Sequence, residues 1–110
     1  METKKGYYYG YDWKNEHMKG PVKGEIELRR HYTDKTYFTA EDFRIYKYRV
    51  MRKPGTVNAT RVLNVWFEEP NDEEARRLIM EVLVKRKGKL EEELKSIEKS
   101  IEALAHMEKS

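Results

Sequence analysis

The chain has 110 residues and a mass of 13.3 kDa, a size that suits one compact domain. Hydrophobic residues make up 38% and charged residues 39% of it, with a net charge of +3, so a mostly disordered chain is excluded. Cysteine is absent, which excludes disulfides, thiolate nucleophiles and cysteine-based metal sites.

No apolar run approaches the roughly 20 residues that span a bilayer. The first ten residues also lack the apolar stretch of a signal peptide. We therefore expect a protein with no membrane association that resides in the cytoplasm, or in the host cytoplasm if its source is a virus.

Before Pro70, short bursts of Tyr, Val, Ile, Phe and Trp alternate with turn residues, which predicts strands. Alternation is clear after Glu25, where Ile26 and Leu28 are expected to face inward. From Ala40 to Lys53 a helix is an alternative, but Tyr and Val favour a strand from about residue 44. The other expected strands cover residues 7–13, 25–32, 36–39 and 60–69, with 25–32 and 36–39 forming a hairpin and 60–69 carrying apolar residues on both faces.

After Pro70 the pattern becomes helical. Asn71 or Asp72 can cap a helix. The acidic residues of its first turn would interact favourably with the positive end of the helix dipole. A wide apolar stripe suited to lying on a sheet follows, formed by Ala75, Leu78, Ile79, Val82 and Leu83.

The last part of the helical segment carries a narrower apolar seam at spacings of four and three residues, the pattern of a coiled coil or an antiparallel helix pair. Gly88 permits either a helix interior or a helix end, so the helix is continuous or kinked, or it folds back there. An unbroken helix to Lys109 would measure about 57 Å, longer than the roughly 35 Å of a compact domain. We therefore expect a homodimer whose interface residues are Leu90, Leu94, Ile97, Ile101 and Leu104.

The fold class predicted from these elements is α+β. It consists of a mostly antiparallel sheet of four or five strands followed by one long C-terminal helix. The whole chain, 1–110, is expected to form one domain, strand-rich over 1–69 and helical over 71–109.

Basic residues are concentrated in the strand-rich part, where 14 Lys or Arg outnumber 10 Asp or Glu up to Pro70. In the densest positive segment, from residue 44 to residue 53, no acid occurs and tyrosines are interleaved. Cations can neutralise phosphates while rings stack on bases, although the same residue types anchor protein interfaces or cover an ordinary solvated strand. The candidate binding residues are Arg44, Tyr46, Lys47, Tyr48, Arg49, Arg52 and Lys53.

Motifs for catalysis are weak. His17, His31 and His106 lack metal-ligand spacing, so no metal or other cofactor is expected. The serines lie only in the last helical segment, and the glycines form no phosphate-binding loop. His31, beside Arg30 and Tyr32, is the one group that resembles the acid/base cluster of a small ribonuclease.

These patterns predict a small non-enzymatic regulatory protein that binds nucleic acid, or a nucleic-acid-handling complex, through the basic, tyrosine-bearing segment. An alternative is an inhibitor or adaptor that docks on a host protein, such as an anti-CRISPR or other counter-defence protein of a phage or mobile element. A small ribonuclease that uses His31 is the third hypothesis.

Overall fold

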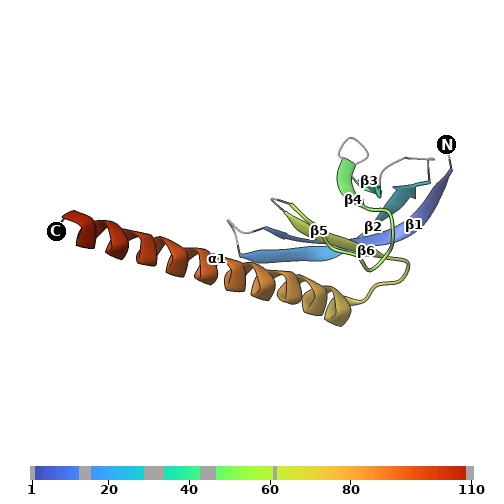
Figure 1. Ribbon diagram of the computed structural model, residues 1–110. Helices are drawn as coiled ribbons and strands as arrows, with labels where there is room; N and C mark the ends of the chain where they lie inside the picture. The colour runs from blue at the N-terminus through green and yellow to red at the C-terminus, as the bar shows by residue number, and fades with distance from the viewer. Residues whose placement is uncertain (1, 13–15, 29–33, 43–46, 61, 109–110) are drawn as a thin grey trace. The chain divides into compact units, whose positions relative to one another are not determined.

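The computed structural model describes residues 2–12, 16–28, 34–42, 47–60 and 62–108. These residues form one antiparallel sheet of six strands followed by a single long helix (Figure 1), which confirms the α+β class. The elements are β1 (Thr3–Asp12), β2 (His17–Glu27), β3 (Lys35–Ala40), β4 (Lys47–Met51), β5 (Asn58–Ala59), β6 (Leu63–Phe67) and α1 (Asp72–Glu108).

The strand count corrects the expected four or five. The additional strand is β5, whose two residues are too few to produce a recognisable alternation. A second correction concerns β2, which begins at His17 rather than Glu25, because pairing with β1 holds its Gly- and Lys-rich first half extended. Leu28, expected to face inward, is 43% exposed and follows the end of β2.

Contacts divide the chain into two compact units, Met1–Met80 and Glu81–Ser110. Helix α1 runs unbroken from Asp72 to Glu108, so the chain does not fold back at Gly88. A Cβ at Gly88 would meet no atom within 4 Å, so glycine there is not required by packing. In the part of the chain that the structure describes, no helix is both long and apolar enough to cross a membrane.

The sheet of the first unit is curled. Its strand order is β4-β3-β2-β1-β6-β5, yet β4 also contacts β6, four places away. The face that this curl encloses, here called the inner face, carries the main hydrophobic cluster. Its large buried side chains are Tyr8, Ile26, Phe38, Val50 and Trp66.

Side chains of β5 and β6 close the curl by donating hydrogen bonds to the backbone of β4. The amides of Asn58 and Asn64 both donate to the carbonyl of Arg49, each at 3.0 Å. The indole of Trp66 donates to the carbonyl of Met51 at 2.6 Å. These bonds satisfy carbonyls at the edge of β4, where no strand is paired, and they hold β4 against β6.

A bulge in β2 changes which residues face inward. Tyr8 pairs with Val22, but Gly10 pairs with Lys19, so β2 contains one more residue than β1 between these two pairs. Lys19 therefore shares the inner face with Val22 although three positions separate them. Gly20 in the bulge has a φ of +127°, and a Cβ there would lie 2.5 Å from the Tyr8 carbonyl oxygen, so only glycine fits.

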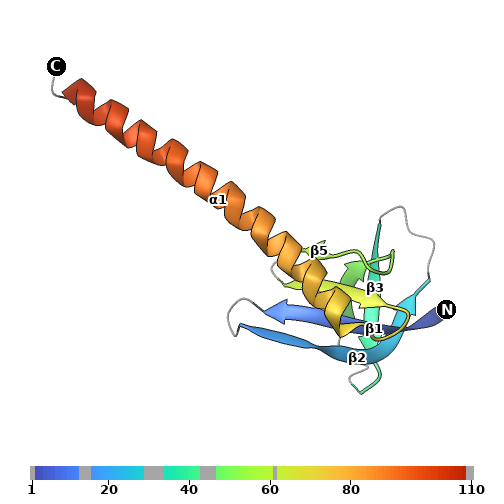
Figure 2. The same cartoon turned by 90° about the horizontal axis from the view of Figure 1, so that it is seen from below.

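The opposite, outer face of the sheet is covered over β1 and β6 by the first turns of α1 (Figure 2). Here Tyr9, Val65 and Ala75 are fully buried. Asn71 caps the helix, as the sequence predicts, because its side-chain oxygen accepts the backbone N–H of Glu74 at 3.2 Å.

Tyr9 links the sheet to the helix N-terminus. Its hydroxyl donates to the Asp72 carboxylate at 2.5 Å and accepts the backbone N–H of Asn71 at 2.9 Å. Burial, together with the hydrogen bond to Asp72, raises the pKa of Tyr9 to about 12. The protonated hydroxyl therefore stabilises this junction at neutral pH.

Replacing Tyr9 by Phe should lower the free energy of unfolding by about 1–3 kcal/mol at neutral pH, because two hydrogen bonds are lost. An unfolded tyrosine has a pKa of about 10. The stabilisation is therefore complete below that pH and is lost as the pH rises toward the folded value. Urea denaturation at several pH values measures the free energy of unfolding of the wild type, of Tyr9→Phe and of the half-buried control Tyr7→Phe. Equal stability of wild type and Tyr9→Phe would contradict it.

Replacing Asn58 by Ala should lower the free energy of unfolding by about 1 kcal/mol, because the carbonyl of Arg49 loses one of its two donors. The substitution should also increase the rate of amide hydrogen exchange more in β4 than in β1. The matched control is Thr60→Ala, since Thr60 is exposed and its hydroxyl donates to the nearby Val62 carbonyl. A change in stability within about 0.5 kcal/mol, as for ordinary surface substitutions, would show that Asn58 does not hold β4.

Candidate functional site

The structure separates the predicted binding residues by strand alternation. Lys47 and Arg49 lie on the outer face of β4, whereas Tyr48 lies on the inner face with the hydrophobic cluster. The predicted interleaving of rings and cations in sequence therefore does not become one mixed surface. Arg44 and Tyr46 lie outside the described residues.

On the outer face, Lys47 and Arg49 flank a tyrosine that the sequence did not single out as a binding residue. The Lys47 ammonium and the Arg49 guanidinium each lie 5.9 Å from the ring centroid of Tyr37 on β3. Lys47 also forms an ion pair of 2.7 Å with Glu27 of β2. We call these four residues the Tyr37 cluster: Glu27, Tyr37, Lys47 and Arg49.

The two cations of the Tyr37 cluster are not equivalent. The side chain of Glu27 is only 5% exposed, and a buried carboxylate needs its counter-ion, so Lys47 has a structural task. Arg49 is exposed and stands next to the ring. Arg49 is therefore the cation of this cluster that is best placed to meet a ligand.

The remaining predicted cations follow the end of β4. Arg52 is half-buried, and its backbone N–H donates to the carbonyl of Asp34 at 2.7 Å. Lys53 is exposed. Of these two cations, Lys53 is the more accessible to a ligand.

On the inner face, Tyr48 meets a lysine from a part of the chain that the sequence did not mark. The ring of Tyr48 stacks on Tyr8 at a centroid distance of 4.6 Å. The Lys19 ammonium donates to the Tyr48 hydroxyl at 3.2 Å and lies 5.5 Å from its ring centroid. These side chains border a cavity of about 290 Å³, here called the inner-face cavity, lined by Tyr8, Gly10, Asp12, His17, Lys19, Tyr48 and Val62.

Tyr8 forms the deepest part of this arrangement. It is 2% exposed, and burial raises its pKa to about 12, so its hydroxyl stays protonated at neutral pH. The amide of Asn64 lies 3.5 Å from that hydroxyl. Only the register of β1, β4 and β6 brings these groups together, and no spacing in the sequence signals them.

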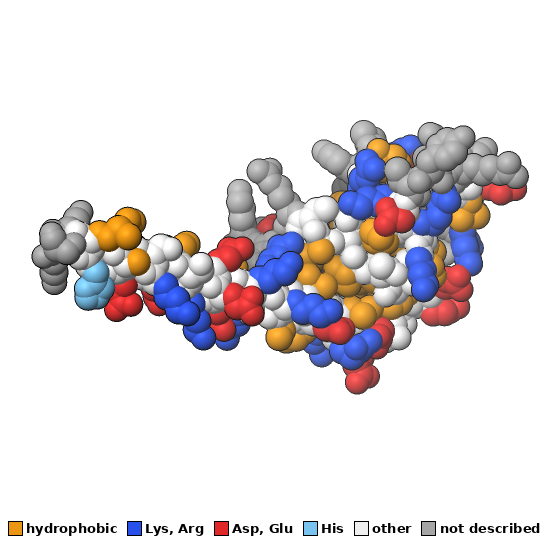
Figure 3. Space-filling model, viewed as in Figure 1, with side chains coloured by type: hydrophobic (Ala, Val, Ile, Leu, Met, Phe, Trp, Pro, Cys, Tyr) orange, Lys and Arg blue, Asp and Glu red, His pale blue; other side chains and the backbone are white. Residues whose placement is uncertain are grey.

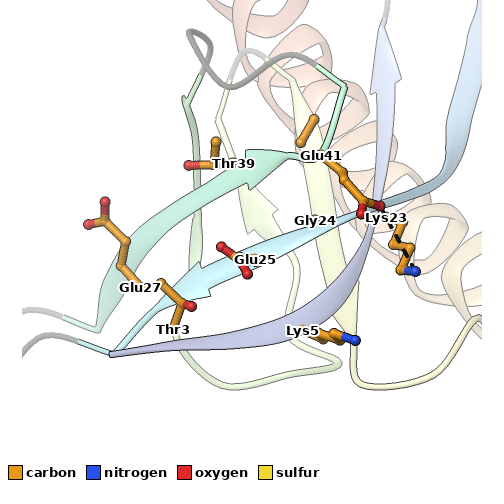
Figure 4. A pocket seen from close by; sticks show the side chains of 9 residues that line it. Thr3, Lys5, Lys23, Gly24, Glu25, Glu27, Thr39 and Glu41 are labelled. Atoms are coloured by element: carbon orange, nitrogen blue, oxygen red, sulfur yellow. Dashed lines mark ion pairs between the residues drawn. The ribbon is translucent and has the colours of Figure 1, made fainter. Parts of the chain in front are cut away.

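A second hollow, of about 420 Å³, crosses β1, β2 and β3 (Figure 4). Charged side chains of both signs surround it, and Lys23 and Glu41 form an ion pair of 3.9 Å across one end. Its three carboxylates outnumber its two lysines, so it is poorly suited to a phosphate. The charged lining residues are Lys5, Lys23, Glu25, Glu27 and Glu41.

In the second unit, the predicted seam of α1 is unburied. Its five side chains are between 56% and 63% exposed. On the face of the helix that Figure 3 shows, hydrophobic side chains gather toward its C-terminal end, with acidic and basic side chains beside them. Large apolar side chains exposed in a row mark an interaction surface. The seam consists of Leu90, Leu94, Ile97, Ile101 and Leu104.

Within the described ranges, no three His, Asp or Glu side chains gather closely enough to hold a metal ion. His31, the candidate acid/base residue, lies outside the described residues, so the ribonuclease hypothesis stays a prediction.

Comparison with protein-family models, with curated proteins and with solved structures found no match to this chain.

Proposed function

We propose that this chain is a non-enzymatic binding protein that binds nucleic acid, alone or within a nucleic-acid-handling complex, through the Tyr37 cluster. The observation that carries this proposal is the pair of cations held at 5.9 Å on the Tyr37 ring, with Arg49 exposed. Such side chains can contact phosphates without recognising the base sequence of the nucleic acid.

Preorganisation supports this role. A surface Arg or Lys normally loses side-chain entropy when it is fixed on a ligand. Contact with Tyr37, and for Lys47 the ion pair with Glu27, already restricts these side chains before a ligand binds. Lys53 at the end of β4 adds an exposed positive charge close in sequence.

Reversing Arg49 and Lys53 to Glu should weaken binding to short oligonucleotides by roughly tenfold or more and lower the salt slope by about two. Stability should stay within about 0.5 kcal/mol of wild type, since both side chains are exposed. Fluorescence anisotropy with single- and double-stranded oligonucleotides, at several salt concentrations, measures the affinity.

The matched control reverses Lys85 and Lys89, two exposed lysines of α1, to Glu. Both double variants carry the same net charge, so a difference between them reports the site and not the overall charge. Equal affinity of the two variants, or absence of binding by wild type at low salt, would reject the Tyr37 cluster as a nucleic-acid site.

We also propose that two copies pair through the seam of α1. In heptad terms Leu94 and Ile101 occupy a positions, and Leu90, Ile97 and Leu104 occupy d positions. Pairing would remove these side chains from water, at about 25 cal/mol for each Å² of apolar surface buried. A dimer would also present two Tyr37 clusters to one nucleic acid and so raise its avidity.

The double change Ile97→Asp with Ile101→Asp should convert dimers to monomers, because each aspartate would place an unpaired charge in the interface. Size exclusion with light scattering measures the mass. The control, Ser96→Asp with Ala103→Asp, adds the same charge at heptad positions away from the seam. A double Ile variant that remains dimeric would show that another surface pairs the copies.

The second candidate function is an adaptor or inhibitor that docks on another protein through the same seam. The observation that favours it is the acidic flank of the seam, where Glu91, Glu93 and Glu98 follow Arg86. A partner helix with basic flanks complements this charge better than a second copy does. A wild-type chain that is monomeric in the light-scattering experiment would favour this function.

A further inference from the structure

The inner-face cavity combines an aromatic wall, a polar rim and a position without a side chain. Its wall is the stacked pair of Tyr8 and Tyr48. A volume of about 290 Å³ lies near the lower end of ligand cavities, which span ~300–1,000 Å³. The cavity therefore suits one small molecule.

Gly10 provides part of this space. A Cβ at Gly10 would lie 2.7 Å from the Tyr8 hydroxyl oxygen, closer than real Cβ contacts. Any side chain here would therefore have to displace the phenol that forms the wall. Glycine at the position facing Lys19 leaves room for that hydroxyl.

The rim is built by the far ends of β1 and β2. Asp12 pairs directly with His17, and Gly10 pairs with Lys19, so all four share the inner face beyond the bulge. The ammonium of Lys19 already donates to the Tyr48 hydroxyl at 3.2 Å, which fixes it above the aromatic wall. A cation held beside a ring surface is arranged to meet an anionic group that is attached to a planar ring.

The base of the cavity offers a further hydrogen bond. The Tyr8 oxygen accepts from the Asn64 amide at 3.5 Å, so its own hydrogen remains to be donated. Asn64 is 5% exposed, and its side-chain oxygen has no partner among the described residues. Tyr8 lines the cavity and Asn64 lies behind it, so the Tyr8 hydroxyl is the group at the base that can orient a ligand.

We infer that the inner-face cavity binds a single nucleotide, with its planar base against the half-buried ring of Tyr48 and its phosphate on Lys19 and His17. Asp12 can accept a hydrogen bond from an amino group of the base or a hydroxyl of the sugar. A simple anion would leave the aromatic wall unused, and an apolar ligand would leave the polar rim of Asp12, His17 and Lys19 unused. The site is separate from the Tyr37 cluster, so this inference does not rest on the proposed nucleic-acid function.

The same chemistry is offered by a free mononucleotide and by the phosphorylated end of a single strand. Calorimetric titrations with AMP, UMP and a 5′-phosphorylated tetranucleotide therefore distinguish the two sources. Ribose 5-phosphate serves as the probe that has the phosphate but lacks the base. We expect binding of at least one base-containing probe and roughly tenfold weaker binding of ribose 5-phosphate, because base stacking contributes about 1–3 kcal/mol.

Lys19→Met should weaken that binding by roughly tenfold or more, because a charge-assisted hydrogen bond to phosphate is lost. Lys23→Met is the matched control, since Lys23 is an exposed lysine on the same strand, on the outer face. Tyrosine ring signals followed by NMR should shift on titration in wild type and in Lys23→Met. The Arg49→Glu, Lys53→Glu variant should bind the nucleotide as wild type does, even if it loses nucleic-acid affinity.

Three results would overturn the inference. The first is no binding of any base-containing probe at millimolar concentration. The second is equal affinity of Lys19→Met and Lys23→Met when both have wild-type melting temperatures. The third is equal affinity for ribose 5-phosphate and the nucleotides. If Lys19→Met melts early, His17→Asn at the exposed rim replaces it in the same comparison.

Discussion

The unpaired backbone edge of β4 is the constraint on which the sheet unit depends. Carbonyl groups at such an edge must find donors or stay in water. Here the donors are side chains, because Asn58 and Asn64 reach the Arg49 carbonyl and Trp66 reaches the Met51 carbonyl. The amide and indole donors thus form the hydrogen bonds that a neighbouring strand would otherwise form with these carbonyls. They hold β4 in the curl that encloses the hydrophobic cluster.

This closure also decides what each face of β4 can do. Tyr48 turns inward, where it stacks on Tyr8, whereas Lys47 and Arg49 turn outward to Tyr37. Two separate combinations of cation and ring result from one strand. The outer one is exposed, and we propose that it meets phosphates of an extended ligand. The inner one borders a cavity, which we propose binds one small molecule. The two proposals can therefore succeed or fail independently.

Helix α1 contributes differently to each of the two units. Its first turns belong to the sheet unit, where Ala75 is buried and Tyr9 bonds to Asp72. The residues from Glu81 onward form a unit of their own whose apolar seam is exposed. A helix that only stabilised the sheet would need no such seam, because exposed Leu and Ile side chains add nothing to its packing. The exposed seam therefore supports the proposal that α1 pairs with a partner helix.

The sequence by itself determined the features that depend on neighbouring residues. The Asn71 cap, the helix that follows, the heptad spacing of the seam and the apolar residues on both faces of β6 are all local patterns, and the structure contains each of them. That the seam of α1 pairs with another helix remains a prediction. Tertiary structure alone decided the first half of β2, its bulge, the short β5 and the closure onto β4. Lys19 meets Tyr48 across 29 positions only because the bulge shifts β2 by one residue and the side-chain amides bend β4 inward. Such contacts depend on register and long-range hydrogen bonds, and these leave no periodic trace in the chain.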